Sequence, residues 1–147
     1  MTQRVYIDTS VVGGAFDTEF DFFTKMFFDK AFRKEIILVV SDLLEEELLQ
    51  APPAVQAFFK SLPTDQLEEV RQTLAAIELA ELYIQEGVVG ETSRADCRHI
   101  ALATINKVDV LVSWNFKHIV NLSGFVAIIQ LICEKVCIPW RLDRQKS

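Results

Sequence analysis

The run at residues 36–40, Ile-Ile-Leu-Val-Val, constrains the fold more than any other feature of this sequence. A continuous run of mostly β-branched residues is typical of a strand that is buried on both faces of a parallel sheet. Two further short strands are expected at residues 4–7 and 110–113. Because helical segments separate these strands, the sequence predicts an α/β fold, a three-layer α/β/α domain with a central, mostly parallel sheet.

The segments between the strands carry helix signals. Ser41 is expected to cap a helix over residues 42–50, which Pro52 and Pro53 would end. Three other helices are expected: one from Phe16 onward, a short one through Phe59, and one over residues 93–106. A loop is expected at residues 9–14. A further helix is expected to carry a core stripe of Leu67, Val70, Leu74 and Ile77 and to end at Gly87. The rest of the chain is expected to form an extended piece at 88–89, a helix over 124–134 and a last strand at 136–138.

Length and composition bound the organisation of the chain. A chain of 147 residues, half of them apolar, fits a single domain over residues 1–147. No signal peptide and no apolar run of about 20 residues is present, so we expect a cytoplasmic protein with no membrane span. Cys97, Cys133 and Cys137 are expected to be buried free thiols, because their number and spacing do not fit a zinc site.

A phenylalanine-rich stripe follows the first glycines. Phe20, Phe23, Phe27 and Ala31 recur at helical spacing, with Phe28 and Phe32 beside them. Core packing or a subunit interface is favoured over base stacking for these rings. Because this stripe exceeds the need of one small core, we expect a homodimer.

Ligand sites of parallel sheets lie beyond the carboxyl ends of the strands, and three acids are candidates for that edge. Asp8 directly follows the first strand, although an Asx turn with Ser10 explains it equally well. Asp96 lies three residues after Ser93, as in a capping box, but it shares a helical stripe with Ile100. The sequence leaves both alternatives open.

The acidic run Glu45, Glu46 and Glu47 is expected to be unequal. On a helical wheel, Glu47 lies about 40° from Leu43 and within the apolar arc, whereas the other two fall outside it. A carboxylate among leucines needs a cation or a basic partner. Glu47 is therefore the third candidate.

Together these acids predict a site for a hard cation. Asp8, Glu47 and Asp96 come from distant positions to one expected edge, and carboxylates this close repel unless a cation such as Mg²⁺ or Mn²⁺ neutralises them. Asn115, after the strand that ends at Ser113, could add a carbonyl oxygen or could simply shape a turn. No phosphate-binding glycine loop or nucleophilic triad pattern is present.

Four segments, in order, resemble the successive motifs of PIN domains, as in VapC-like toxins. They are Y-I-D-T-S at 6–10, S-D-L-L-E-E-E-L at 41–48, A-D-C-R-H-I-A-L-A at 95–103 and D-V-L-V-S-W-N-F-K-H-I at 109–119. The resemblance implies a metal-dependent endoribonuclease with an antitoxin partner, in which Asp8, Glu47 and Asp96 match the family's acids. Asn115 stands where the family usually has a fourth acid, so a second metal site would be weak.

The expected contacts and the alternatives complete the hypothesis. Thr9, Ser10 and Ser113 could bond water or phosphate near the metal, and Arg98 or Lys117 could hold the RNA backbone. His99 and His118 are interpreted as packed or surface residues. The net charge of −6 and Asn115 favour the main alternative, a PIN-like scaffold that binds RNA or protein without cutting. A haloacid dehalogenase-type phosphatase is disfavoured, because Ser10 stands where its second Asp would be.

Overall fold

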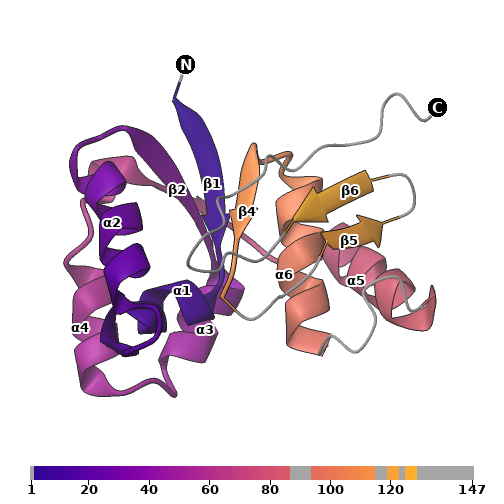
Figure 1. The fold of residues 1–147 in the computed structure, drawn as a ribbon. Coiled ribbons are helices and arrows are strands. Elements are labelled where there is room, and N and C mark those ends of the chain that lie inside the picture. The colour runs from indigo at the N-terminus through magenta and orange to yellow at the C-terminus, as the bar shows by residue number, and fades with distance from the viewer. Residues whose placement is uncertain (1, 87–93, 115–118, 123–124, 129–147) are drawn as a thin grey trace.

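The computed structural model describes residues 2–86, 94–114, 119–122 and 125–128, and its centre is a four-stranded, all-parallel sheet (Figure 1). The strand order is β3-β2-β1-β4. The strands are β1 (Gln3–Ile7), β2 (Ile36–Ser41), β3 (Leu67–Val70) and β4 (Val110–Val112). The predicted α/β class with a parallel central sheet is confirmed, with the apolar run in β2 and β1 next to it.

Helices cover both faces of this sheet (Figure 1). One side carries α1 (Thr9–Gly13), the turn η1 (Gly14–Phe16), α2 (Asp21–Phe32), α3 (Asp42–Leu48) and α4 (Pro53–Lys60). The other side carries α5 (Leu74–Glu86) and α6 (Arg94–Ile105), which pack against each other. The turn η2 (Thr64–Gln66) precedes β3, and β5 (Ile119–Leu122) pairs with β6 (Phe125–Ile128) as an antiparallel hairpin.

Alternation along the strands divides the core into two halves. Val5 and Ile7 pack on the side of α1, α2 and α4, whereas Tyr6, between them, packs on the side of α5 and α6. All three side chains are at most 3 % exposed. Because successive side chains of a strand point to opposite faces, β1, which leads directly to Asp8, contributes side chains to both halves of the core.

The predicted helical stripe that began at Leu67 is wrong. Residues Leu67–Val70 form β3, which pairs in parallel with β2. The helix begins only at Leu74, and its buried face is Ala76, Ala80 and Tyr83, while Leu74 is 70 % exposed. The tertiary structure overrides the local pattern here, because β2 would otherwise present an unpaired edge.

Three other expectations differ from the structure. Residues 9–14 are helical, in α1 and η1, rather than a loop, and the helix expected from Phe16 begins at Asp21. Residues 125–128 are extended in β6 rather than helical. Gly87, the pieces at 88–89 and 136–138, and residues 129–134 lie outside the described residues.

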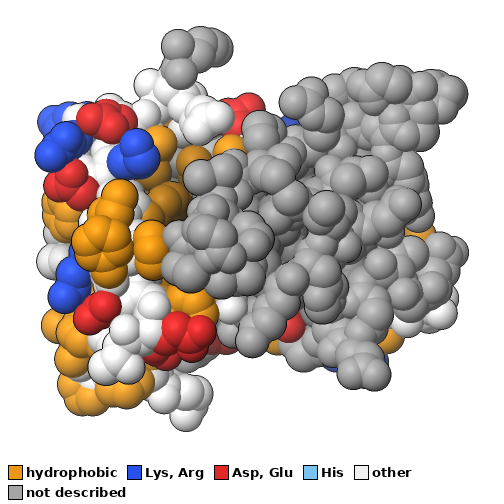
Figure 2. Space-filling model, viewed as in Figure 1, with side chains coloured by type: hydrophobic (Ala, Val, Ile, Leu, Met, Phe, Trp, Pro, Cys, Tyr) orange, Lys and Arg blue, Asp and Glu red, His pale blue; other side chains and the backbone are white. Residues whose placement is uncertain are grey.

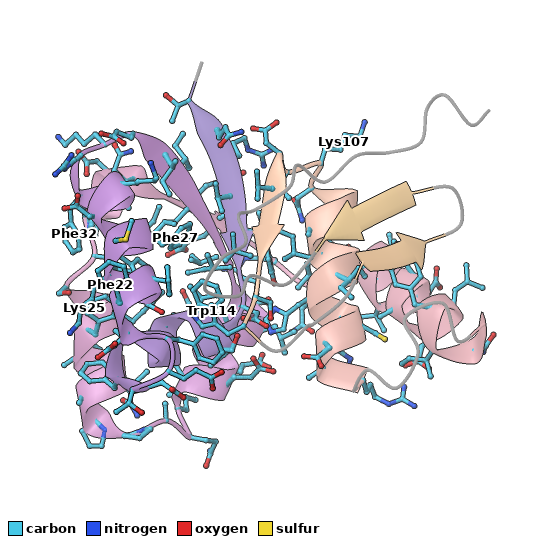
Figure 3. The ribbon with its side chains drawn as sticks, in the orientation of Figure 1. Phe22, Lys25, Phe27, Phe32, Lys107 and Trp114 are labelled. Carbon is cyan, nitrogen blue, oxygen red and sulfur yellow. The ribbon has the colours of Figure 1, made fainter. Side chains whose placement is uncertain are left out.

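The phenylalanine-rich helix α2 has a buried side and an exposed side. Phe28 is buried, and Phe20, Phe23 and Phe27 pack partly buried against the core. By contrast, three large apolar side chains are 47–63 % exposed and form what we call the α2 face: Phe22, Met26 and Phe32. Apolar side chains gather over α2 in Figure 2, and Figure 3 shows the rings of its phenylalanines along the helix. Core packing is confirmed for part of the stripe.

Two smaller expectations concern the thiols and the membrane. Cys97 is a buried free thiol, as predicted, whereas Cys133 and Cys137 lie outside the described residues. None of the helices in the described part is long and apolar enough to cross a membrane.

Candidate active site

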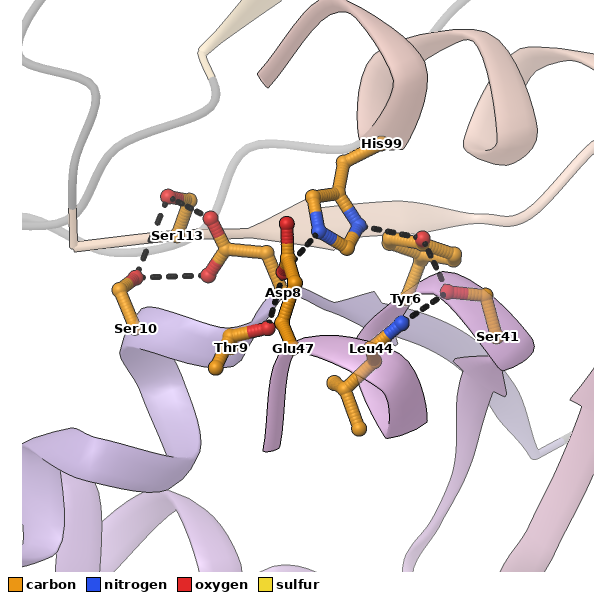
Figure 4. A network of polar contacts seen from close by, with 9 residues as sticks. All are labelled: Tyr6, Asp8, Thr9, Ser10, Ser41, Leu44, Glu47, His99 and Ser113. Carbon is orange, nitrogen blue, oxygen red and sulfur yellow. Dashed lines mark hydrogen bonds and ion pairs between the residues drawn. The ribbon is translucent and has the colours of Figure 1, made fainter. Parts of the chain in front are cut away.

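Asp8 lies at the carboxyl end of β1, where the chain turns into α1, and its side chain is 1 % exposed. The Ser10 hydroxyl donates to Asp8 Oδ1 at 2.6 Å, and the Ser113 hydroxyl donates to Oδ2 at 2.6 Å (Figure 4). Ser113 directly follows β4, the neighbouring strand. Asp8 does contact Ser10, but through the serine hydroxyl and not through the backbone N–H that an Asx turn uses, and a second hydroxyl comes from the adjacent strand end.

Burial raises the pKa of Asp8, because the carboxylate loses water. The charge of His99 and the two serine hydroxyls lower that pKa, and the nearby Asp96 raises it, but the net shift is upward. Ionised Asp8 is thus a poorly compensated charge in the folded protein. A bound cation would supply the missing compensation.

Trp114 ties the position of Ser10 to helix α2. Its backbone N–H donates to Ser10 Oγ at 2.9 Å, and its indole Nε1–H donates to Thr24 Oγ1 at 2.9 Å. The indole also stacks on the ring of Phe20, with centroids 5.4 Å apart. The segment after β4 is therefore anchored both to Ser10, which bonds the Asp8 carboxylate, and to Thr24 of α2.

Glu47 reaches the same edge of the sheet from α3. It is partly buried, whereas Glu45 and Glu46 are exposed, so the three acids differ in burial as the helical wheel predicts. The Thr9 hydroxyl and the His99 ring both contact Oε1 of Glu47, His99 Nε2 at 2.9 Å. Burial raises the pKa of Glu47, but the hydrogen bonds from His99 and Thr9 outweigh it and the net shift is downward.

His99 and Tyr6 belong to the site although the sequence analysis did not include them. His99, for which the sequence leaves a packed and a surface position open, is packed at 2 % exposed, and its second nitrogen, Nδ1, lies 2.6 Å from the Tyr6 hydroxyl. Two signals could have found them: Tyr6 is a polar-tipped residue on a buried strand, and His99 follows Asp96 by three residues on one helix. Without the fold, neither signal distinguishes a site residue from an ordinary core residue.

The remaining candidates are placed unequally. Asp96 is in the first turn of α6, partly buried, and near enough to Asp8 to influence its pKa. Ser93, which the capping alternative requires, lies outside the described residues, as do Asn115 and Lys117. Arg98 is partly buried, and within the described part its Nε is buried without a hydrogen-bond partner. Its contact with RNA remains a prediction.

The donor set suits a hard cation. Asp8, Glu47 and Asp96 are oxygen donors, and the upward pKa shift of buried Asp8 is the feature that a cation would reverse. Among the described residues, however, no group of three or more acidic, histidine or cysteine side chains is already gathered closely enough to hold a metal ion. The predicted metal site thus stays a prediction.

Comparisons with known proteins bear on the fold. No protein-family model matches the sequence, and a search of curated proteins finds no match. Among solved structures, VapC20 of Mycobacterium tuberculosis, described as a sarcin-ricin loop cleaving toxin, superposes with a TM-score of 0.57 at 16 % identity, over 77 % of this chain and 89 % of that one. The fold is a VapC-like PIN fold.

A second solved structure agrees with this PIN-like fold. A chain of VapBC2 from Rickettsia felis, determined bound to a DNA fragment from the promoter, superposes with a TM-score of 0.53 at 18 % identity, over 76 % of this chain and 88 % of that one. The resemblance that the sequence motifs indicated is therefore matched by the arrangement of the strands and helices.

Proposed function

We propose that this protein is a divalent-metal-dependent endoribonuclease, the toxin of a toxin–antitoxin pair, which hydrolyses phosphodiester bonds of RNA in the cytoplasm. The observation that carries the proposal is the buried carboxylate of Asp8 at the end of a central strand of a PIN-like fold. Asp96 lies near enough to influence its pKa, and Glu47 is hydrogen-bonded to Thr9, the residue after Asp8. A VapBC complex among the similar structures supports an antitoxin as the partner, and a sarcin-ricin loop cleaving toxin supports RNA as the substrate.

In this proposal, Asp8, Glu47 and Asp96 hold one or two Mg²⁺ or Mn²⁺ ions, and Asn115 contributes at most to a weak second site. A bound ion would supply an acidified water as the nucleophile and would neutralise charge that develops on the phosphate. The hydroxyls of Ser10 and Ser113 fix the orientation of the Asp8 carboxylate, since each holds one of its oxygens at 2.6 Å. Thr9 orients Glu47 in the same way.

The first test is RNA cleavage by the purified full chain with Mg²⁺ or Mn²⁺, with and without EDTA. We expect cleavage of single-stranded RNA that EDTA abolishes. Asp8→Asn should lower the rate by about 100-fold or more, because it removes a charge on which the metal site is built. Absence of cleavage of structured and unstructured RNA with either metal would favour the non-enzymatic PIN-like scaffold.

A matched pair on helix α3 sharpens this test. Glu47→Gln should lower Mn²⁺ affinity and cleavage by about 10- to 100-fold. Glu45→Gln, two residues earlier on the exposed side of the same helix, should leave both unchanged. Equal effects of the two substitutions in calorimetric titration would contradict the assignment of Glu47 to the site.

A further inference from the structure

A chain of hydrogen bonds begins at Ser41, the residue that precedes α3, and ends at Glu47 within that helix (Figure 4). Ser41, the N-cap of α3, accepts from the Leu44 N–H at 3.1 Å and from the Tyr6 hydroxyl at 2.9 Å. The Tyr6 hydroxyl lies 2.6 Å from His99 Nδ1, and His99 Nε2 lies 2.9 Å from Glu47 Oε1. The circuit thus joins α3, β1 and α6 and closes on α3.

Three of the residues in this circuit are buried. Tyr6, Ser41 and His99 are 0, 1 and 2 % exposed, so an unpaired polar group in any of them would be costly. The His99 ring meets the Tyr6 ring edge-on, with centroids 5.7 Å apart. Since an ionised carboxylate only accepts hydrogen bonds, Nε2 carries a hydrogen and donates to Glu47. The Tyr6 hydroxyl therefore determines the ring orientation that aims this N–H.

We propose that Tyr6 and His99 are positioning residues, which hold the Glu47 carboxylate at the metal-binding edge of the sheet. The proposal rests on the proposed function, because it assigns their role to that same site. Both donors to Glu47, His99 Nε2 and Thr9 Oγ1, converge on Oε1. Oε2 accepts no hydrogen bond from the described residues and is the oxygen that a cation would use.

If His99 served only to pack the core, its N–H would not need to donate to Glu47. A buried histidine needs only some acceptor for its N–H, and a backbone carbonyl within the core would serve. Here the acceptor is instead a side chain that is 28 % exposed, on the one member of the acidic run that faces the site. The hydrogen bonds of the buried circuit therefore fix the position of a partly exposed carboxylate.

The test compares two buried tyrosine hydroxyls. Tyr6→Phe removes the hydroxyl from the circuit. Tyr83→Phe removes a hydroxyl that lies 3.4 Å from Thr104 Oγ1 in the same half of the core and outside the site. We expect Tyr6→Phe to weaken Mn²⁺ binding, measured by electron paramagnetic resonance, by about tenfold and to lower kcat by a similar factor. Tyr83→Phe should change neither, and thermal unfolding reports the stability of both.

A second pair tests the donor directly. His99→Met removes the N–H that Glu47 accepts, while His99→Gln retains an amide donor on a side chain of comparable reach. We expect His99→Met to weaken Mn²⁺ binding by about 10- to 100-fold and His99→Gln to recover most of that loss. If His99→Gln and His99→Met weaken Mn²⁺ binding equally, or if Tyr6→Phe and Tyr83→Phe have the same effect, the positioning role is refuted.

These outcomes separate the positioning role from the proposed function. Wild type that binds Mn²⁺ without cutting RNA would refute the nuclease and leave the role of Tyr6 and His99 to be judged on Mn²⁺ affinity. Wild type that cuts RNA, with Tyr6→Phe as active and as tightly bound to Mn²⁺ as Tyr83→Phe, would refute the positioning role alone. Wild type that neither binds Mn²⁺ nor cuts RNA would overturn both.

Discussion

The buried position of the Asp8 carboxylate suits the binding of a cation but lowers the stability of the metal-free fold. Its side chain is buried at the end of β1, and burial, which removes hydrating water, is the main cause of its raised pKa. A raised pKa means that the folded protein binds the Asp8 proton more tightly than the unfolded chain does. Ionised Asp8 therefore destabilises the metal-free fold at pH values above that pKa, and the penalty disappears below the unfolded pKa.

Because the folded state raises the pKa of Asp8, we predict that Asp8→Asn, the substitution expected to slow cleavage, stabilises the metal-free protein. In EDTA at neutral pH its Tm should rise by about 4 °C, the shift expected for roughly 1 kcal/mol in a domain of this size. The amide can still pair with the hydroxyls of Ser10 and Ser113, because a hydroxyl both donates and accepts. The gain should shrink as the pH falls toward 4, and a pH-independent difference between the two melting curves would contradict the assigned cause.

Individual residues also differ in how well the sequence predicts them. Glu47 was separable from Glu45 and Glu46 because a helical wheel depends only on local geometry. The sequence leaves His99 as a packed or surface residue, and its burial shows that it is packed. Its contact with Glu47 joins positions 52 residues apart. Such a contact depends on how α3 and α6 are placed by the sheet.

At the scale of elements, the short helical segment α1–η1 is joined to the strand end after β4 by a close contact at Gly14. A Cβ atom on Gly14 would lie 2.5 Å from Thr24 Oγ1 and would also overlap the indole of Trp114. These are the two groups of the Trp114–Thr24 hydrogen bond. Gly14 is thus required by a close approach, since its φ of −61° is available to any residue.

We predict that Gly14→Ala destabilises the fold by about 1–3 kcal/mol through overpacking against Trp114. Cleavage should fall as well, because the Trp114 N–H holds Ser10 beside Asp8. The matched control is Gly13→Ala, whose added Cβ would meet nothing within 4 Å and whose φ of −67° suits alanine. It should be neutral or stabilising by about 0.4–1 kcal/mol. Urea unfolding of both variants measures the difference, and similar losses would contradict the contact.

At the scale of the whole molecule, the α2 face is an apolar surface that one domain leaves uncovered. Phe22, Met26 and Phe32 are 63, 54 and 47 % exposed on a single helix. Exposed apolar side chains gathered on one helix commonly mark an interface between proteins, and a self-complementary patch would pair two copies. The predicted homodimer remains a prediction, and this face is where we expect its contact.

The test of this face is a change of oligomeric state. Phe22→Ser should convert a dimer to a monomer in light scattering at micromolar concentration, with little loss of stability, because most of the ring is exposed. Leu74→Ser changes another exposed apolar side chain, 70 % exposed at the start of α5, and should leave the dimer intact. A monomeric wild type would contradict the homodimer, and a dimeric Phe22→Ser would remove this face from its interface.

The sequence by itself determined the parallel sheet and the acidic candidates, because both follow from short-range patterns. The run in β2, the Ser41 cap and the position of Asp8 after a strand each depend on neighbouring residues alone. Secondary structure can be predicted from such local preferences wherever the tertiary packing agrees with them.

Only the tertiary structure decided the rest. Residues 67–70 form a strand because they pair with the edge of β2, and Leu74, at the start of the following helix, is exposed and not part of the core. The two hydroxyls on Asp8 come from positions 10 and 113, and the circuit through Tyr6 and His99 crosses three elements. These contacts form between residues far apart in sequence, where the hydrogen-bond partner of a buried polar group is set by the packing of the elements and not by the residues beside it.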